Sequence, residues 1–166
     1  MARCLIIGCG CRGRLLAREL IGRGHAVRGT TRDPAGRAAI EATGAEAVLA
    51  DPDRVVTLTP ALEHVAVSYI LFASARTRPG APELTALHGT RLQMLLTRML
   101  DTTVRGIIYE ARGSVDGGVL ARGAARVRAF CEDSRIPYVL LDADPAKPGA
   151  WVQEAAGAAE RVLAAR

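Results

Sequence analysis

Three glycines near the N-terminus constrain this chain more than any other feature. Gly8, Gly10 and Gly13 follow an apolar segment, residues 4–7, at the spacing G-x-G-x-x-G, and a helical pattern begins directly after them. In a strand-turn-helix unit, the first glycine permits a tight turn, the second admits a phosphate, and the third lets the helix pack against the strand. The first N–H groups of the helix then attract the phosphates. The turn, including Cys11 and Arg12, is therefore predicted to bind a dinucleotide; the alternative is a glycine-rich turn without a ligand.

The end of the next predicted strand indicates which dinucleotide is preferred. A protein that binds NAD usually carries a carboxylate there for the ribose hydroxyls, whereas this chain has Thr30, Thr31 and Arg32. Hydroxyl and guanidinium groups suit a 2′-phosphate. We therefore expect NADP rather than NAD, with Thr31 and Arg32 among the binding residues. The alternative is that Arg32 is a solvated surface arginine.

Apolar segments and amphipathic segments alternate along the rest of the chain. Strands are predicted near residues 4–7, 26–31, 47–49, 67–73, 106–109 and 137–141, and long helices near residues 83–100, 118–134 and 150–165. This alternation favours an α/β fold with a doubly wound parallel sheet, the Rossmann fold, in strand order 3-2-1-4-5-6. With 166 residues, we expect a single dinucleotide-binding domain over residues 1–166 and no separate substrate domain.

Composition argues against several other classes of protein. The formal net charge is +5, but the cations are scattered and aromatic residues make up 4% of the chain, so nucleic-acid binding is not expected. No apolar run is long enough to span a membrane, and we expect a cytoplasmic protein. The four cysteines and three histidines lack the spacing of metal ligands, so no metal site is predicted.

Several motifs in the expected order resemble the extended and atypical short-chain dehydrogenase/reductases, the group similar to NAD-dependent epimerases and dehydratases. The resemblance covers about residues 3–142. Besides the glycine turn, it rests on the segments G-H-A-V at 24–27, T-R-D-P at 31–34, A-D at 50–51, F-A-S-A at 72–75, H-G-T at 88–90, R-G-I-I-Y at 105–109 and R-I-P-Y-V-L-L at 135–141. The resemblance implies that Asp51 meets the adenine amine and that Ala73 and Ser74 line the nicotinamide side. It also implies a homodimer in which the helices after the fourth and fifth strands pair.

The catalytic residues of that family do not have counterparts here. The positions of its Tyr-x-x-x-Lys pair fall on Leu120 and Ala124, neither of which can donate a proton. The asparagine of the family's N-v-x-G-T helix is replaced by Ala86, and an arginine after the sixth strand by Asp142. The resemblance therefore implies cofactor binding without the usual catalysis.

Two functions remain open at this point. The first is an NADP-binding protein without turnover, which acts as a cofactor sensor or a partner subunit. The second is a small NADP-dependent oxidoreductase or epimerase-like enzyme with unusual catalytic residues near 110–114, its substrate enclosed by segment 77–82 or by a second subunit. Candidate catalytic residues are Glu110, Ser114 and Tyr109. Tyr109 is expected to point into the core, and Glu110 either to serve the site or to pair with Arg112 or Arg122.

Overall fold

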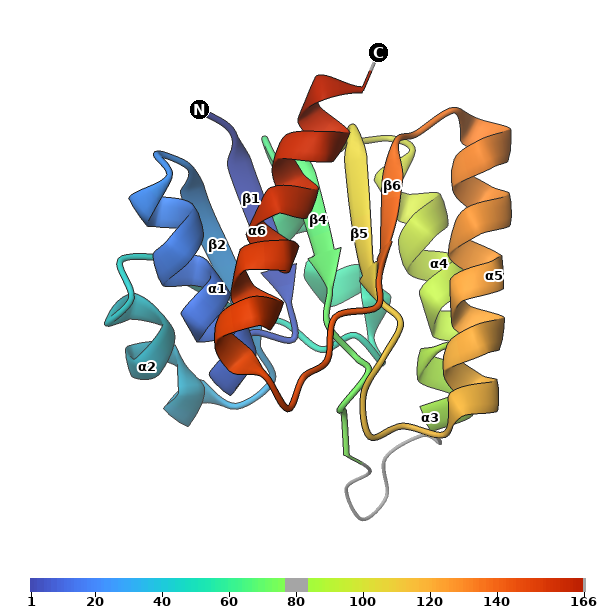
Figure 1. The fold of residues 1–166 in the computed structure, drawn as a ribbon, viewed down its shortest axis with the longest axis horizontal. Coiled ribbons are helices and arrows are strands. Elements are labelled where there is room, and N and C mark those ends of the chain that lie inside the picture. The colour runs from blue at the N-terminus through green and yellow to red at the C-terminus, as the bar shows by residue number, and fades with distance from the viewer. Residues whose placement is uncertain (77–83, 166) are drawn as a thin grey trace.

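A six-stranded parallel sheet forms the centre of the protein (Figure 1). The computed structural model describes residues 1–76 and 84–165. The strands are β1 (Arg3–Ile7), β2 (Ala26–Thr31), β3 (Glu46–Leu49), β4 (Val67–Ile70), β5 (Gly106–Glu110) and β6 (Tyr138–Leu141). Their order is β3-β2-β1-β4-β5-β6, and all neighbouring strands run parallel. The predicted fold class and strand order are confirmed.

Helices cover both faces of the sheet, as Figure 1 shows. They are α1 (Cys11–Gly22), α2 (Arg37–Glu41), α3 (Leu84–Leu87), α4 (Thr90–Met99), α5 (Gly117–Ser134) and α6 (Pro148–Ala164). Apolar side chains of α1 and α6 pack in one core cluster, and those of α4 and α5 pack in another on the opposite face. In β1 the four residues after Arg3 are all apolar because both faces of the strand are buried there.

Short turns of helix fill the connections that the sequence pattern left unassigned. They are η1 (Pro34–Gly36), η2 (Val55–Leu58) and η3 (Pro60–Leu62). The buried guanidinium of Arg28 on β2 holds the last of them. It donates hydrogen bonds to the carbonyl oxygens of Ala61 (2.7 Å) and Glu63 (3.0 Å).

The prediction of one continuous helix over residues 83–100 was wrong. The chain forms α3, breaks at His88 and Gly89, and resumes as α4. The backbone at Gly89 lies so close to the preceding turn that a Cβ atom there would be 2.7 Å from the carbonyl oxygen of Thr85. The break lets the His88 side chain enter the core. The predicted start of that helix, and segment 77–82, lie outside the described residues.

Other differences concern the ends of elements. The fourth strand ends at Ile70 rather than at residue 73, so Leu71–Arg76 forms an irregular segment beyond the sheet. Helix α5 begins at Gly117, where the side chain of Asp116 caps it by accepting a hydrogen bond from the backbone N–H of Val119 (3.1 Å). No helix among residues 1–76 and 84–165 is long and apolar enough to cross a membrane.

Candidate functional site

The turn between β1 and α1 has the geometry that the glycine pattern predicts. Gly8 has φ +82°, and a Cβ atom at this position would be 2.8 Å from the carbonyl oxygen of Leu71. The backbone N–H of Cys9 donates to the carbonyl oxygen of Thr30 (3.1 Å), which ties the turn to β2. A Cβ atom on Gly10 would meet nothing within 4 Å, so the space above the start of α1 is open. Because the first N–H groups of a helix have no partner one turn earlier, this start can bind an anion.

A cavity of about 410 Å³ lies over this turn, at the carboxyl ends of the strands. The glycine turn, the end of β2, the segment after β3 and the segment after β4 form most of its walls, and Gly36 and helix α3 add to them. Its lining residues include Gly8, Gly10, Cys11, Arg12, Gly13, Thr31, Arg32, Pro52, Asp53, Phe72, Ser74 and Leu87. Ligands of doubly wound sheets bind at this edge, where the strand order reverses between β1 and β4.

Most of the charged side chains that line the cavity are positive. The described residues that line it include four arginines, Arg12, Arg14, Arg32 and Arg76, and one carboxylate, Asp53. The guanidinium of Arg32 lies 4.0 Å from Oδ2 of Asp53, while Oδ1 of Asp53 is buried without a hydrogen-bond partner. This balance favours a ligand with several negative charges.

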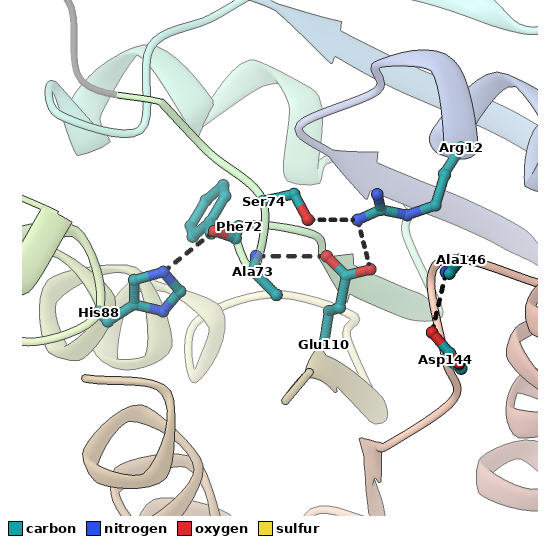
Figure 2. Close-up of polar contacts among 8 residues, drawn as sticks. All are labelled: Arg12, Phe72, Ala73, Ser74, His88, Glu110, Asp144 and Ala146. Carbon is teal, nitrogen blue, oxygen red and sulfur yellow. Dashed lines mark hydrogen bonds and ion pairs between the residues drawn. The ribbon is translucent and has the colours of Figure 1, made fainter. Parts of the chain in front are cut away.

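The side chain of Arg12 crosses from the glycine turn toward β4 and β5 (Figure 2). Its Nη2 donates to Oε2 of Glu110 (2.8 Å) and to Oγ of Ser74 (3.1 Å). The guanidinium carbon also lies 5.4 Å from the centre of the Trp151 ring, which places the cation over an aromatic face. Three elements distant in sequence therefore hold this one side chain.

Glu110 is fully buried at the end of β5. One carboxylate oxygen pairs with Arg12, and the other accepts a hydrogen bond from the backbone N–H of Ala73 (3.2 Å). Burial raises the pKa of Glu110, whereas Arg12 and the Ala73 N–H act in the opposite direction. The alternative that Glu110 pairs with Arg112 or Arg122 is wrong: the partner comes from the glycine turn, and Arg112 lies 3.6 Å from Asp144.

The structure places most of the predicted cofactor residues on the cavity wall, but not all of them. Gly8, Gly10, Cys11, Arg12, Gly13, Thr31, Arg32 and Ser74 line it. Asp51 does not belong to the lining residues; its Oδ1 accepts from the backbone N–H of Asp53 (3.0 Å) and shapes the turn that brings Asp53 to the wall. Ala73 lies behind the wall, with its N–H directed at Glu110.

The three catalytic candidates do not converge on one point. Tyr109 is fully buried, and its hydroxyl group lies 2.6 Å from Nδ1 of His88. Ser114 is exposed and is not a lining residue of the cavity. Glu110 lies beneath Arg12 rather than on the cavity surface.

Sequence reasoning missed Trp151, Asp53 and His88. Trp151 comes from α6, the last helix, and no pattern near it points to the glycine turn. Asp53 lies two residues beyond the carboxylate that the family resemblance selects. Among residues 1–76 and 84–165, no group of three or more His, Cys, Asp or Glu side chains could hold a metal ion.

No family model matches the chain, and no curated protein sequence matches it. Solved structures match its fold. A short-chain dehydrogenase/reductase superfamily protein from Agrobacterium tumefaciens, solved with bound NAD, superimposes with a TM-score of 0.68 at 20% identity. The match covers 97% of this chain and 61% of the Agrobacterium chain. UDP-glucuronic acid 4-epimerase from Bacillus cereus, in complex with NAD, superimposes with a TM-score of 0.65 at 16% identity. The match covers 83% of this chain and 54% of the epimerase chain.

A third similar structure is the triphenylmethane reductase of a Citrobacter species, complexed with NADP(H). Its TM-score is 0.62 at 17% identity, and the match covers 83% of this chain and 48% of that one. The predicted resemblance is thus confirmed for the fold: these three similar structures are a short-chain dehydrogenase/reductase superfamily protein, an epimerase and a reductase. The chain spans roughly half to three fifths of their length.

Proposed function

We propose that this chain binds a nicotinamide dinucleotide, with NADP preferred to NAD, and that it acts as a cofactor sensor or a partner subunit without Tyr-Lys catalysis. One observation carries the proposal: a single cavity extends from Arg32 at the end of β2, over the glycine turn, to Ser74 after β4. A dinucleotide in a doubly wound fold occupies this path, with its pyrophosphate at the start of the first helix.

The residues of the cavity fit such a ligand. The open space above Gly10 admits the pyrophosphate to the start of α1. Arg32 and Thr31 lie where the ribose next to the adenine ring binds in this fold. The apolar side chains of Phe72, Leu84 and Leu87 offer a surface for the nicotinamide ring at the other end. When bound, the nicotinamide supplies an acceptor or donor of hydride.

Two residues at the adenosine end favour different ligands. Arg32 favours the 2′-phosphate of NADP, whereas the unpartnered Oδ1 of Asp53 suits a ribose hydroxyl of NAD. We give Arg32 the greater weight because Arg32 itself lies near enough to offset the charge of Asp53, and because the cavity as a whole is cationic. A more anionic ligand gains more from such a site.

Calorimetric titration of NADP and NAD tests this proposal. We expect NADP to bind in the micromolar range, and Arg32→Ala to weaken NADP about tenfold while NAD changes little, because an arginine-phosphate contact is lost. The matched variant Asp53→Asn removes the opposing charge and should tighten NADP more than NAD. Failure of wild-type protein to bind either dinucleotide would overturn the function; an equal loss of NADP and NAD in Arg32→Ala would overturn only the NADP preference.

The surroundings of Glu110 support binding without turnover. A general acid must reach the substrate, and both oxygens of this carboxylate are engaged with Arg12 and Ala73 below the cavity surface. The Tyr-Lys positions, Leu120 and Ala124, carry no proton donor. The test is whether the protein consumes NADPH with any of a panel of carbonyl compounds and quinones. Activity that Glu110→Gln abolishes would contradict this proposal and support the alternative function, a small oxidoreductase.

A further inference from the structure

Arg12 is the residue of the glycine turn that reaches the β4 side of the cavity. Its guanidinium lies 3.1 Å from Ser74, the residue that follows Ala73 on the segment after β4. Because the cavity runs from Arg32 over the glycine turn, a dinucleotide whose adenosine lies at Arg32 directs its nicotinamide toward Arg12 and Ser74. This step rests on the proposed function.

The structure holds Arg12 in this position from several sides. Glu110 contributes a carboxylate with no exposed surface, Ser74 contributes a hydroxyl group, and Trp151 contributes a fully buried ring. If Arg12 moved away, it would leave a buried carboxylate without its counter-charge, which is strongly unfavourable. Arg12 is therefore fixed before a ligand arrives, rather than recruited by it.

The Arg12–Glu110 ion pair is oriented, with its positive end at the cavity and its negative end in the core. Arg12 lines the cavity and its side chain is 26% exposed, whereas Glu110 is fully buried and does not line it. The pair as a whole is neutral, but Arg12, its positive end, is the member that lines the cavity, and Figure 2 shows Glu110 bound to it. Leu71, Phe72 and Leu84 also line this part, so water screens the charge less than at an open surface. Arg76, which is exposed, adds a second positive charge at this end.

We propose that Arg12, held by Glu110, makes the site selective for the reduced cofactor over the oxidised one. The oxidised nicotinamide ring carries a positive charge and the reduced ring carries none, while the rest of the two ligands is the same. A fixed positive end beside the ring therefore opposes the oxidised form alone. The site then reports the oxidation state of the nicotinamide pool, and a protein without turnover can do so without consuming its ligand.

The experiment compares dissociation constants of NADPH and oxidised NADP by calorimetry under anaerobic conditions. In wild-type protein we expect NADPH to bind roughly three- to tenfold more tightly, the size of a partly screened charge interaction. Glu110→Gln removes the negative end of the pair and keeps Arg12, so the preference for NADPH should increase. The double variant Arg12→Met/Glu110→Gln removes both charges, so neither is left unpaired, and the affinities for NADPH and oxidised NADP should become nearly equal.

A ligand without the ring provides the control. The 2′-phosphate of ADP-ribose has the phosphates and sugars of NADP but no nicotinamide, and its affinity should change by less than about twofold in Glu110→Gln. Equal wild-type affinities for NADPH and oxidised NADP, or a preference that Glu110→Gln decreases, would overturn the inference while the proposed function stands. If none of the three ligands binds wild-type protein, the proposed function fails and the inference fails with it.

Discussion

The hydroxyl group of Tyr109 and Nδ1 of His88 lie 2.6 Å apart inside the core, between β5 and the break that separates α3 from α4. The other ring nitrogen of His88 lies 3.1 Å from the carbonyl oxygen of Phe72, which can only accept a hydrogen bond. The imidazole therefore donates through Nε2, and when the ring is neutral its Nδ1 accepts from the Tyr109 hydroxyl. Burial lowers the pKa of His88, in agreement with this arrangement.

Removal of the Tyr109 hydroxyl should destabilise the fold. In Tyr109→Phe, Nδ1 of His88 loses its donor in a buried position, which costs about 1–3 kcal/mol in the free energy of unfolding. Tyr138→Phe is the matched control, because the Tyr138 hydroxyl bonds to Glu132 at the exposed surface, where substitutions usually change stability by less than about 0.5 kcal/mol. Urea unfolding measures both; equal effects in the two variants would contradict the buried contact.

Acid should destabilise the protein through His88. The folded state holds this ring neutral, whereas the unfolded chain protonates its histidines below about pH 6.5. Below that pH the unfolded state binds more protons than the folded state. The stability that the neutral ring contributes above about pH 6.5 is therefore lost as the pH falls from there toward the lowered pKa of His88 in the folded state. The free energy of unfolding, measured at several pH values, should fall more steeply in wild-type protein than in His88→Gln. Parallel curves would argue against a neutral, buried His88.

Gly123 of α5 lies against the Tyr109 hydroxyl, and a Cβ atom at this position would overlap it. We expect Gly123→Ala to lower the free energy of unfolding by about 1–3 kcal/mol through overpacking. The loss should be smaller in a Tyr109→Phe background, where the overlapping oxygen is absent. Gly157→Ala on α6 is the control, because its Cβ would have only an ordinary contact with Arg161 at 3.6 Å and should gain about 0.5–1 kcal/mol of helix propensity. Thermal unfolding of wild type, Gly123→Ala, Tyr109→Phe, the double variant and Gly157→Ala measures these effects; a Gly123→Ala variant as stable as wild type would contradict the packing.

The homodimer stays a prediction. The apolar stripe of α4, which includes Leu92, Leu95 and Met99, packs into the core, and Met94 is the large apolar side chain that α4 leaves 49% exposed. If α4 pairs across a two-fold axis, light scattering at micromolar concentration should give a dimer mass, and Met94→Glu should shift it to the monomer. Leu49→Glu, at a similarly exposed position on the edge strand β3, should leave the mass unchanged. A monomer mass for wild-type protein would refute the prediction.

The sheet could be predicted because its signals are local. Each strand is an apolar run bounded by a turn, and the glycine spacing at 8, 10 and 13 marks where the strand order reverses. The right-handed crossover of parallel strands then leaves few arrangements. The helix break at Gly89 was missed because apolar residues stand at helical spacing on each side of it, Leu84 and Leu87 before it and Leu92, Leu95 and Leu96 after it.

The centre of the candidate site depends on contacts between distant residues. Arg12 and Glu110 are 98 positions apart, and the sequence offered Arg112 and Arg122 as nearer cations. Only the parallel pairing of β1, β4 and β5 brings the glycine turn next to the end of β5. The same pairing, together with α6, sets Trp151 beside Arg12.

Trp151 is the single tryptophan of this protein. Its ring is fully buried and lies 5.4 Å from the guanidinium carbon of Arg12, so its fluorescence arises from one defined place beside the cavity. A charged ligand that binds beside Arg12 alters the electric field at this ring and thereby the colour and intensity of its emission. The chain thus contains its own optical probe, and occupancy of the site can be followed in the unmodified protein without a label.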